Sequence, residues 1–443
     1  MNWRRRSVAT LAGAFLLASG PAHVVQGQPA PPPTSGASVL EWNARAAQLI
    51  VGPGGAAKAP PLGLVDLAIV HTAIYDAVNA VSGFPFRSYA TAPNVPGSAS
   101  GDAAVAAAGR HTLLALFPDR SDDIEGWYVA SLAAIPDGEE ETNGIAVGEA
   151  AAAGILALRA NDGRNAGTGI VEPPAAPGVW VRTPPAFAAP QVPWARYITP
   201  WNLDDPSQIR PGPPPRLASR KYRTDYEEVK AFGSAAGGAA SDEQKDIGRF
   251  WGDQPMLQWN RAWRGIALDR QLSGMDAARF FAMLSTAGAD ALIACWDAKF
   301  EYMFWRPVTS IPVGGGDPRL TGDPGWSPLV TTPNHPEYPG GHGCFTGASI
   351  STLKRFFRTD AFAFTIDSNF AGVSAPVRSY SRFSEALDEM VDARVYGGMH
   401  YRFSSEAGAV IGRKAAREAA RAFRPAPFDR DDEGHDDDDR ELH

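Results

Sequence analysis

The chain has 443 residues, and 44% of them are hydrophobic, so it is long enough to bury a large core. Its formal net charge is -8, but residues 429–441 hold nine acidic side chains against two arginines, so the rest of the chain is close to neutral. A near-neutral body offers no basic surface for nucleic acid, and we therefore expect no nucleic-acid partner.

The N-terminus is typical of an export signal. Three arginines at residues 4–6 precede an apolar stretch at residues 8–18, and small residues follow near Ala22 and Gly27. This order predicts a signal peptide over 1–27, and consecutive arginines are compatible with twin-arginine export. We expect an exported protein, periplasmic or secreted. No later segment is expected to be long and apolar enough to cross a membrane.

Helical patterns dominate the N-terminal half once the leader ends. Residues 28–37 are rich in Pro, Gly and Ser and are interpreted as a flexible leader. From Leu64 to Val81, apolar residues recur at helical spacing, and alanine, the strongest helix former, dominates several later segments. The helices predicted here are 64–81, 102–117, 122–134 and 141–160.

Residues 163–219 differ from the rest of the chain because prolines are frequent in them. They predict a long stretch without regular secondary structure, and such stretches are usually functional or covering. Trp180, Trp194 and Trp201 punctuate the stretch, whereas a plain interdomain linker rarely needs bulky aromatic residues. We expect an ordered excursion that wraps over the helices, with the three tryptophans as pins.

Helical patterns resume after residue 220, and convincing alternating strand patterns are scarce. Ser404 or Ser405 is placed to cap the last helix. We predict an all-α protein, with helical bundles joined by long Pro-rich loops. One helical domain is expected over 38–425, with an N-terminal half (38–235) and a catalytic C-terminal half (240–425), followed by an acidic disordered tail over 426–443. The predicted helices are 222–232, 241–251, 257–271, 276–305, 343–358, 382–396 and 405–423.

The first of three short clusters in the C-terminal half is Lys299-x6-Arg306-Pro307. On the predicted helix, a spacing of seven places both cations on one face, about 10.5 Å apart along the axis. Trp296 lies three residues before Lys299 on the same side. Because the flanking residues are aromatic, we expect a buried helix whose two cations converge on one anion, rather than two cations on a solvated surface.

The second cluster, HPEYPGGHGC at residues 335–344, precedes a predicted helix. Gly340 and Gly341 allow the backbone to approach a ligand, and a helix start presents free N–H groups to an anion. His342 at this position is suited to exchange protons with a bound oxygen. Glu337 is interpreted as a solvated turn residue with no assigned role.

The third cluster is Arg394-x5-His400, with two glycines at 397–398 between them. A spacing of six does not share a helical face, so the glycines are expected to end a helix near Arg394 and to place His400 after the turn. Asp253 and Asp290 are the candidate carboxylates for orienting Arg394. Together the three clusters predict a cage for a tetrahedral oxyanion.

The two cysteines lie beside this predicted cage. Cys295 comes just before Lys299, and Cys344 comes just after His342. In an oxidising compartment they would form a disulfide that ties two segments of the site, and otherwise they would be two buried free thiols.

The order and spacing of the three clusters resemble those of the vanadium-dependent haloperoxidases, members of the type 2 phosphatidic acid phosphatase superfamily. The family pattern is Lys-x6-Arg-Pro, Pro-Ser-Gly-His and Ser-Arg-x5-His. This chain matches the first part in full, and departs at Gly340 and at Ala393, where the family has serines. The resemblance extends from about Trp42 to about Phe423 and implies the soluble haloperoxidase branch.

The resemblance implies vanadate as the cofactor, with His400 bonded to vanadium. Hydrogen peroxide and halide would be the substrates, with His342 as the acid/base and Lys299 polarising the peroxide. Because Gly340 lacks a hydroxyl, one hydrogen bond to vanadate is expected to be missing. The groups that would surround the vanadate oxygens are Lys299, Arg306, Gly340, Gly341 and Arg394.

Two further positions bear on the halide. Trp296 matches a tryptophan near the halide pocket of chloroperoxidases, and His335 falls where bromoperoxidases tend to have histidine and chloroperoxidases phenylalanine. The resemblance therefore implies bromide or iodide rather than chloride. The alternatives are a soluble acid phosphatase, in which a phosphate ester would phosphorylate His400, and a non-catalytic oxyanion-binding protein.

Overall fold

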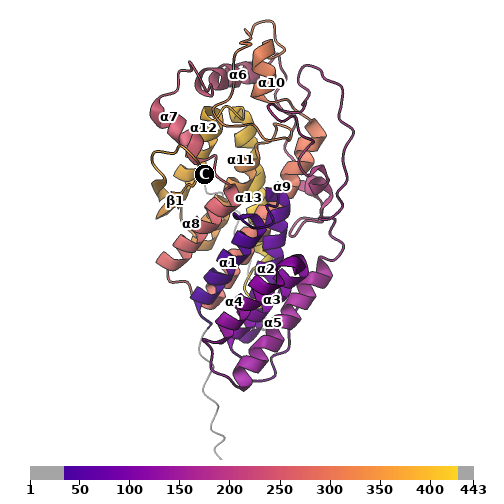
Figure 1. The fold of residues 1–443 in the computed structure, drawn as a ribbon, viewed down its shortest axis with the longest axis vertical. Helices are drawn as coiled ribbons and strands as arrows, with labels where there is room; N and C mark the ends of the chain where they lie inside the picture. Colours follow the sequence, from indigo (N-terminus) through magenta and orange to yellow (C-terminus); the bar gives the residue numbers. More distant parts are fainter. Residues whose placement is uncertain (1–33, 428–443) are drawn as a thin grey trace, which may run out of the picture.

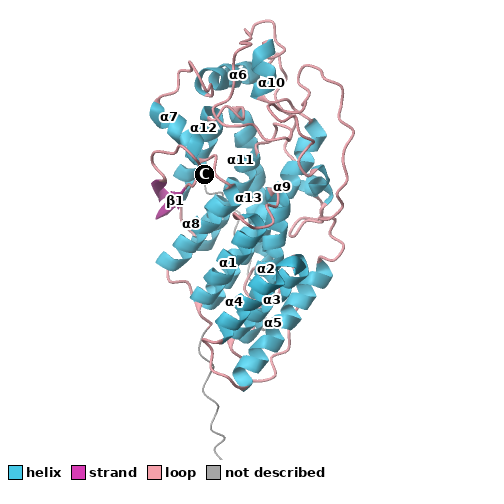
Figure 2. Cartoon of the chain, viewed as in Figure 1, coloured by secondary structure: helices cyan, strands magenta, loops and turns pink. Residues whose placement is uncertain are grey.

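Helices account for most of the molecule, as the alanine-rich segments lead one to expect (Figure 2). The computed structural model describes residues 34–427. The predicted signal peptide lies outside this range, as does the predicted acidic tail apart from Ala426 and Pro427. The all-α prediction is confirmed. The α-helices are α1 (Gly36–Val51), α2 (Pro60–Val81), α3 (Gly101–Leu116), α4 (Ser121–Leu132), α5 (Glu139–Leu158), α6 (Arg220–Phe232), α7 (Asp242–Phe250), α8 (Pro255–Asp269), α9 (Gly274–Tyr302), α10 (Pro307–Ser310), α11 (Gly341–Phe357), α12 (Phe383–Tyr396) and α13 (Arg402–Ala422).

The prediction of a flexible leader over residues 28–37 is wrong for its last residues, because they belong to helix α1. Ser35 caps the helix by accepting the Ala37 N–H, so the helix already begins at Gly36. Trp42 and Ile50 on its inner face are fully buried. Small and polar residues at the helix start concealed the amphipathic pattern that follows them.

Helix α2 is the centre of an N-terminal bundle with α3 and α5, and α4 packs on α3 (Figure 1). Small side chains allow these helices to pack closely. A Cβ atom added at Gly148 of α5 would lie 2.3 Å from the Ala104 carbonyl oxygen of α3, so only glycine is accommodated there.

Helix α9 runs through the middle of the molecule and joins the two bundles, because α2 packs on it from one side and α11 and α13 from the other (Figure 1). Helices α11 and α13 meet along a seam of glycines spaced by four residues. A Cβ added at Gly408 would lie 2.4 Å from the Gly340 carbonyl oxygen, and one at Gly412 would lie 2.2 Å from the Ala348 nitrogen. The start of α11 is therefore held directly against the backbone of α13.

Two helices have the length and hydropathy of membrane spans, which contradicts the expectation that no later segment would. They are α2 and α9, and 94% of the apolar window of each is buried inside the molecule. Their apolar character is accounted for by this burial, since both helices contact neighbours on all sides. Such core helices pass the same test as true spans.

The Pro-rich excursion covers the helices as predicted, and its short 3-10 turns are η2 (Pro193–Tyr197) and η3 (Pro206–Ile209). Trp180 and Trp201 are buried, and Trp194 is half-buried. The Asp290 carboxylate of α9 accepts the backbone N–H groups of Trp201 and Asn202 at 2.6 and 2.8 Å. Helical carboxylates thus hold the excursion in place.

A two-stranded hairpin is the strand structure that the sequence prediction omitted. Strands β1 (Ala361–Asp367) and β2 (Val377–Arg382) pair antiparallel at one side of the molecule (Figure 2). Phe362, Phe364 and Ile366 alternate inward in β1 and reach the core. The last helix begins at Arg402 rather than near residue 405, with Tyr401 in the cap position and no side-chain cap, so the predicted serine cap is wrong.

Candidate active site, a buried cage of cations and histidines

The residues of the three clusters come together at the end of α9, at the start of α11 and after α12. Lys299, Arg306, Arg394 and His400 are all buried, with exposures of 2% or less. Buried cations need compensating partners, because an isolated charge in the interior is costly. Their contacts therefore define what the site is built to hold.

The prediction that Lys299 and Arg306 share one helical face is wrong. Helix α9 ends at Tyr302, where Met303 takes a left-handed conformation (φ 45°) and its N–H bonds the Lys299 carbonyl. The excursion then binds the backbone that follows α9: the Trp180 N–H donates to the Met303 carbonyl at 2.6 Å, and the Trp305 N–H donates to the Gly178 carbonyl at 3.1 Å. The two cations still converge, because the chain turns back after Met303.

Arg306 is the centre of the cage. Its Nη1 lies 2.9 Å from His400 Nε2 and also donates to the Met399 carbonyl at 2.9 Å. Its Nη2 lies 2.9 Å from His335 Nδ1, and its Nε donates to the His335 carbonyl at 3.0 Å. One guanidinium therefore orders both the second and the third cluster.

Lys299 faces the same space but is held by backbone. Its Nζ donates to the carbonyls of Pro336 at 2.8 Å, Glu337 at 3.1 Å and Pro339. An ammonium group has three N–H donors, and all three are used here. Lys299 thus orders the loop that leads to α11, and burial together with Arg306 and Arg394 holds its pKa well below that of an exposed lysine.

Arg394 closes the far side of the cage. Its Nη1 donates to Trp251 O at 2.7 Å, its Nη2 contacts the Met399 thioether at 3.1 Å, and its Nε has no partner. The two carboxylates predicted to orient it do not touch it. Asp253 pairs with Arg261, and Asp290 binds the excursion, so a backbone carbonyl performs that task instead.

His342 lies in the first turn of α11, as predicted, and its Nε2 is buried without a partner. A Cβ added at Gly341 would lie 3.7 Å from the Trp296 ring and 4.0 Å from Lys299 Cε, so this turn lies beside the first cluster. A Cβ added at Gly340 would lie 3.1 Å from Ser405 Cα. A serine at position 340 would therefore press against the start of α13, which would have to move by a few tenths of an ångström.

Glu337 is fully buried, which overturns its interpretation as a solvated turn residue. Its Oε1 lies 3.0 Å from His400 Nδ1 and accepts the Tyr401 N–H at 3.0 Å, while Oε2 has no partner. One sequence signal could have indicated its role. Glu337 lies between two prolines that fix the loop, two residues after His335 and five before His342.

Burial and mutual repulsion set the electrostatics of the cage. Burial and, to a lesser extent, the nearby Arg306 lower the pKa of Arg394 to about 9. Burial and the adjacent cations hold the pKa values of His342 and His400 well below the ordinary histidine value. Both imidazoles are therefore neutral at physiological pH, and each keeps a lone pair.

A disulfide joins Cys295 and Cys344, which decides between the two alternatives left open by the sequence. Cys295 lies one helical turn before Lys299, and Cys344 lies two residues after His342. The bridge therefore fixes α9 against the start of α11 directly below the cage.

The halide-pocket candidates lie together at the side of the cage. The rings of Trp296 and His335 have centroids 5.0 Å apart, and Trp296 Nε1 donates to the Gln191 carbonyl of the excursion at 3.1 Å. Residue 191 is itself held, since its N–H donates to Asn334 O at 2.7 Å. The excursion thus covers this side of the site.

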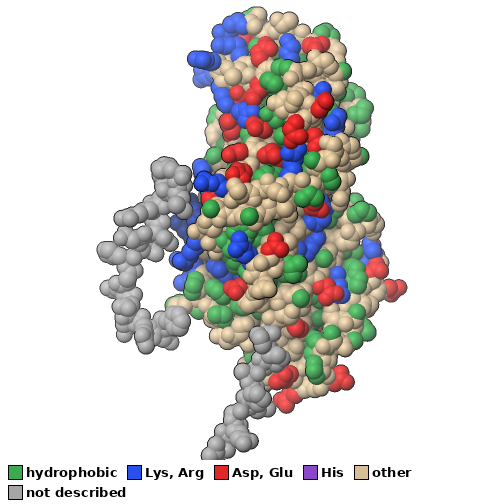
Figure 3. Space-filling view, turned by 90° about the vertical axis from the view of Figure 1, so that its left-hand side faces the viewer, with side chains coloured by type: hydrophobic (Ala, Val, Ile, Leu, Met, Phe, Trp, Pro, Cys, Tyr) green, Lys and Arg blue, Asp and Glu red, His purple; other side chains and the backbone are tan. Residues whose placement is uncertain are grey.

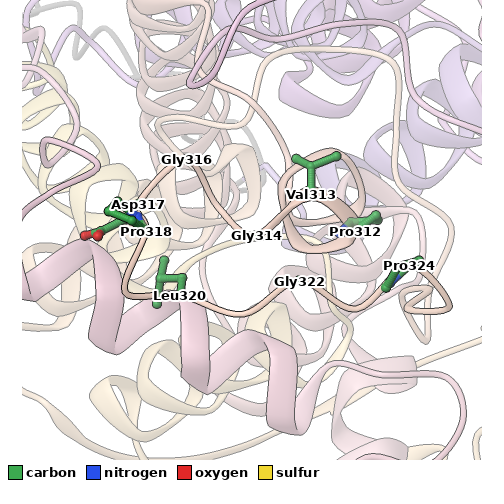
Figure 4. A pocket seen from close by; sticks show the side chains of 9 residues that line it. All are labelled: Pro312, Val313, Gly314, Gly316, Asp317, Pro318, Leu320, Gly322 and Pro324. Carbon is green, nitrogen blue, oxygen red and sulfur yellow. The ribbon is translucent and has the colours of Figure 1, made fainter.

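An open surface pocket lies apart from the cage, in the loop between α10 and α11 (Figure 4). Asp317, which lines this pocket, forms ion pairs with Arg319 and Arg223. Basic side chains gather at this end of the molecule with acidic ones beside them (Figure 3).

Residues 279–426 match the family of the VCPO second helical-bundle domain. The vanadium chloroperoxidase of Curvularia inaequalis is 26% identical over an alignment of 262 residues, which covers 44% of this chain and 43% of that enzyme. The chain thus spans less than half the length of this curated relative. Among solved structures, a bacterial vanadium-dependent iodoperoxidase superimposes with a TM-score of 0.76 at 24% identity, covering 90% of this chain and 99% of that one.

A bacterial vanadium-dependent chloroperoxidase in its holo form superimposes with a TM-score of 0.61 at 18% identity, covering 86% of this chain and 95% of that one. These two structures establish the fold. The C-terminal bundle thus matches the family of the VCPO second helical-bundle domain, and the chain is similar to a vanadium chloroperoxidase in sequence and to vanadium haloperoxidases in fold.

Proposed function

We propose that this protein is a vanadate-dependent haloperoxidase that oxidises bromide or iodide with hydrogen peroxide to hypohalous acid. The observation that carries the proposal is that three buried cations surround His400: Arg306 contacts its Nε2, and Lys299 and Arg394 lie close enough to lower its pKa. Among the described residues, no group of three or more His, Cys, Asp or Glu side chains gathers to hold a metal cation. The site's chemistry is that of an anion receptor.

The side chains present fit a tetrahedral oxyanion. Arg394 Nε and His342 Nε2 are buried without partners, so two polar groups await a ligand. The helix start at Gly341 adds backbone N–H groups, which favour anions. Three cations and one carboxylate leave a net positive charge that suits an oxyanion.

In the proposed reaction, bound vanadate supplies the electrophilic centre that activates peroxide for oxygen transfer to halide. His400 would hold the vanadate through its Nε2 lone pair, which accepts from Arg306 Nη1 in the absence of the ligand, and Arg306 and Arg394 would neutralise the negative charge. His342 is neutral, so its free nitrogen can accept a proton from an incoming peroxide. Lys299 acts by its positive charge, since its N–H donors are bound to carbonyls.

The preference for bromide or iodide rests on His335. Its ring lies against Trp296, and Arg306 donates to it, so a polar group replaces an apolar wall at this side of the cage.

The test is a monochlorodimedone halogenation assay with chloride, bromide and iodide, each with and without orthovanadate. We expect vanadate-dependent turnover of bromide and iodide, and loss of this turnover in His400→Ala and His342→Ala. His111→Ala is the control, because that histidine lies on α3 in the N-terminal bundle. Full bromination by His400→Ala would refute the assigned role.

A phosphatase assay separates the proposal from its main alternative. Hydrolysis of p-nitrophenyl phosphate without vanadate, together with no halogenation in its presence, would identify a phosphomonoesterase that uses the same cage. Binding of oxyanions with neither activity would identify a non-catalytic binding protein.

A further inference from the structure

Glu337 is a buried carboxylate in contact with His400 Nδ1, and it has no role in the proposed reaction. It is fully buried in the loop before α11, and its own N–H donates to the Phe304 carbonyl at 2.9 Å. The loop is further held by Lys299, which binds carbonyls on both sides of this residue. The carboxylate therefore has a fixed position.

The hydrogen bonds around His400 define its tautomer. Arg306 can only donate, so His400 Nε2, 2.9 Å from Arg306 Nη1, must carry the lone pair. A neutral imidazole then bears its proton on Nδ1, which lies 3.0 Å from Glu337 Oε1. That oxygen also accepts the Tyr401 N–H at 3.0 Å, so it acts as an acceptor throughout.

We propose that Glu337 is a positioning residue that holds His400 in the Nδ1-protonated tautomer and strengthens its Nε2 lone pair as a ligand for the central atom of a bound oxyanion. The inference rests on the proposed function for the identity of that oxyanion. A histidine that donates its second N–H to a carboxylate is a stronger and better oriented ligand, and loss of such a partner weakens metal binding about 10–100-fold.

A purely structural role for Glu337 makes a different prediction. A carboxylate that only stabilised the fold would lower the melting temperature when removed and leave ligand affinity unchanged. Asp290 supplies the comparison, since it is equally buried, lies on α9, and binds the backbone N–H groups of the excursion rather than a site residue.

The experiment compares wild type, Glu337→Ala, Glu337→Gln and Asp290→Asn, with two measurements on each purified, oxyanion-free protein. The first is the ¹⁵N chemical shifts of the histidine ring nitrogens, with His400→Ala used to assign the signal. The second is the dissociation constant for orthovanadate, with inorganic phosphate as a parallel probe, by titration calorimetry.

We expect wild-type His400 to be protonated at Nδ1, and Glu337→Ala to lose this preference and bind orthovanadate about 10–100-fold more weakly. Glu337→Gln keeps the volume but lacks the charge, and we expect about tenfold weaker binding with the fold retained. Asp290→Asn should lower the melting temperature and leave the dissociation constant at the wild-type value.

Wild-type His400 protonated at Nε2, or vanadate affinities in both Glu337 variants equal to wild type, would overturn the inference. Equal loss of affinity in Asp290→Asn would also overturn it, because the effect would then follow from stability alone. If Glu337→Ala does not fold, Glu337→Gln carries the test by itself. If wild type binds vanadate or phosphate and does not halogenate, the proposed function fails while the tautomer and affinity measurements still decide the role of Glu337.

Discussion

The disulfide between Cys295 and Cys344 allows a quantitative prediction. Replacing both residues by alanine removes a bridge that closes a loop with a sequence separation of 49 residues. The chain-entropy relation for a loop of this length gives a loss of about 4 kcal/mol in the free energy of unfolding at 25 °C. For a folded body spanning residues 34–427, the unfolding entropy is about 0.8 kcal/mol/K, so the melting temperature should fall by about 5 °C.

The assay is thermal unfolding of wild type, each single alanine variant and the double variant, with and without dithiothreitol. Each single variant already removes the whole bridge, so we expect the double variant to add little to either. Reductant should lower the melting temperature of wild type and leave the variants unchanged. Two results would refute the reasoning. One is a wild-type melting temperature that stays the same after the protein has been unfolded and refolded in reductant. The other is the detection of two free thiols in the unfolded, unreduced protein.

Three other predictions address packing, pH and ligand binding. Gly408→Ala places a Cβ 2.4 Å from the Gly340 carbonyl oxygen and should lower the free energy of unfolding in urea by about 1–3 kcal/mol. The control, Gly265→Ala, lies in open space on α8 and should be neutral or stabilising. Equal effects of the two variants would contradict the close packing of the seam. Burial raises the pKa of Asp290 to about 6, so its contribution to stability is full below about pH 4 and is lost as pH rises through about 6. The stability of wild type relative to Asp290→Asn should therefore fall by about 3 kcal/mol over that range, and a rise would show the opposite sign of shift. Orthovanadate at one hundred times its dissociation constant should add about 2.7 kcal/mol to the free energy of unfolding, compared with sodium chloride of equal ionic strength. No increase beyond the sodium chloride control would show that the cage does not bind orthovanadate.

Much of the helical architecture was predictable because local sequence determines it. Alanine-rich segments with apolar residues at helical spacing gave α2, α3 and α5 within a few residues of their observed bounds. Helix α1 was missed because its start lies in a small-residue segment. The hairpin was missed because the alternation of Phe362, Phe364 and Ile366 is weak, with apolar Ala363 between the first two.

The candidate site was predictable in composition but not in its connections. The cations and histidines were found from motif spacing, whereas the end of α9 at Tyr302 depends on backbone bonds from Trp180 and Trp305 that no local pattern reveals. For the same reason Glu337 looked solvated, since its burial depends on Tyr401, which is 64 residues away in the chain. The partner of Arg394 was sought among carboxylates, and a carbonyl from Trp251 provides it.

The excursion has a consequence for how the chain responds to cleavage. Residues 165–169 at its start are exposed. Before them, Arg159 donates to the carbonyls of Thr199 and Pro200, and the Asp162 carbonyl accepts the Thr199 N–H. Helix α1 packs on α8 and α9, and α2 packs on α9, so both sides of a cut at 165–169 share one core. A protease that nicks the chain there should yield two fragments that remain associated under native conditions and separate only in denaturant.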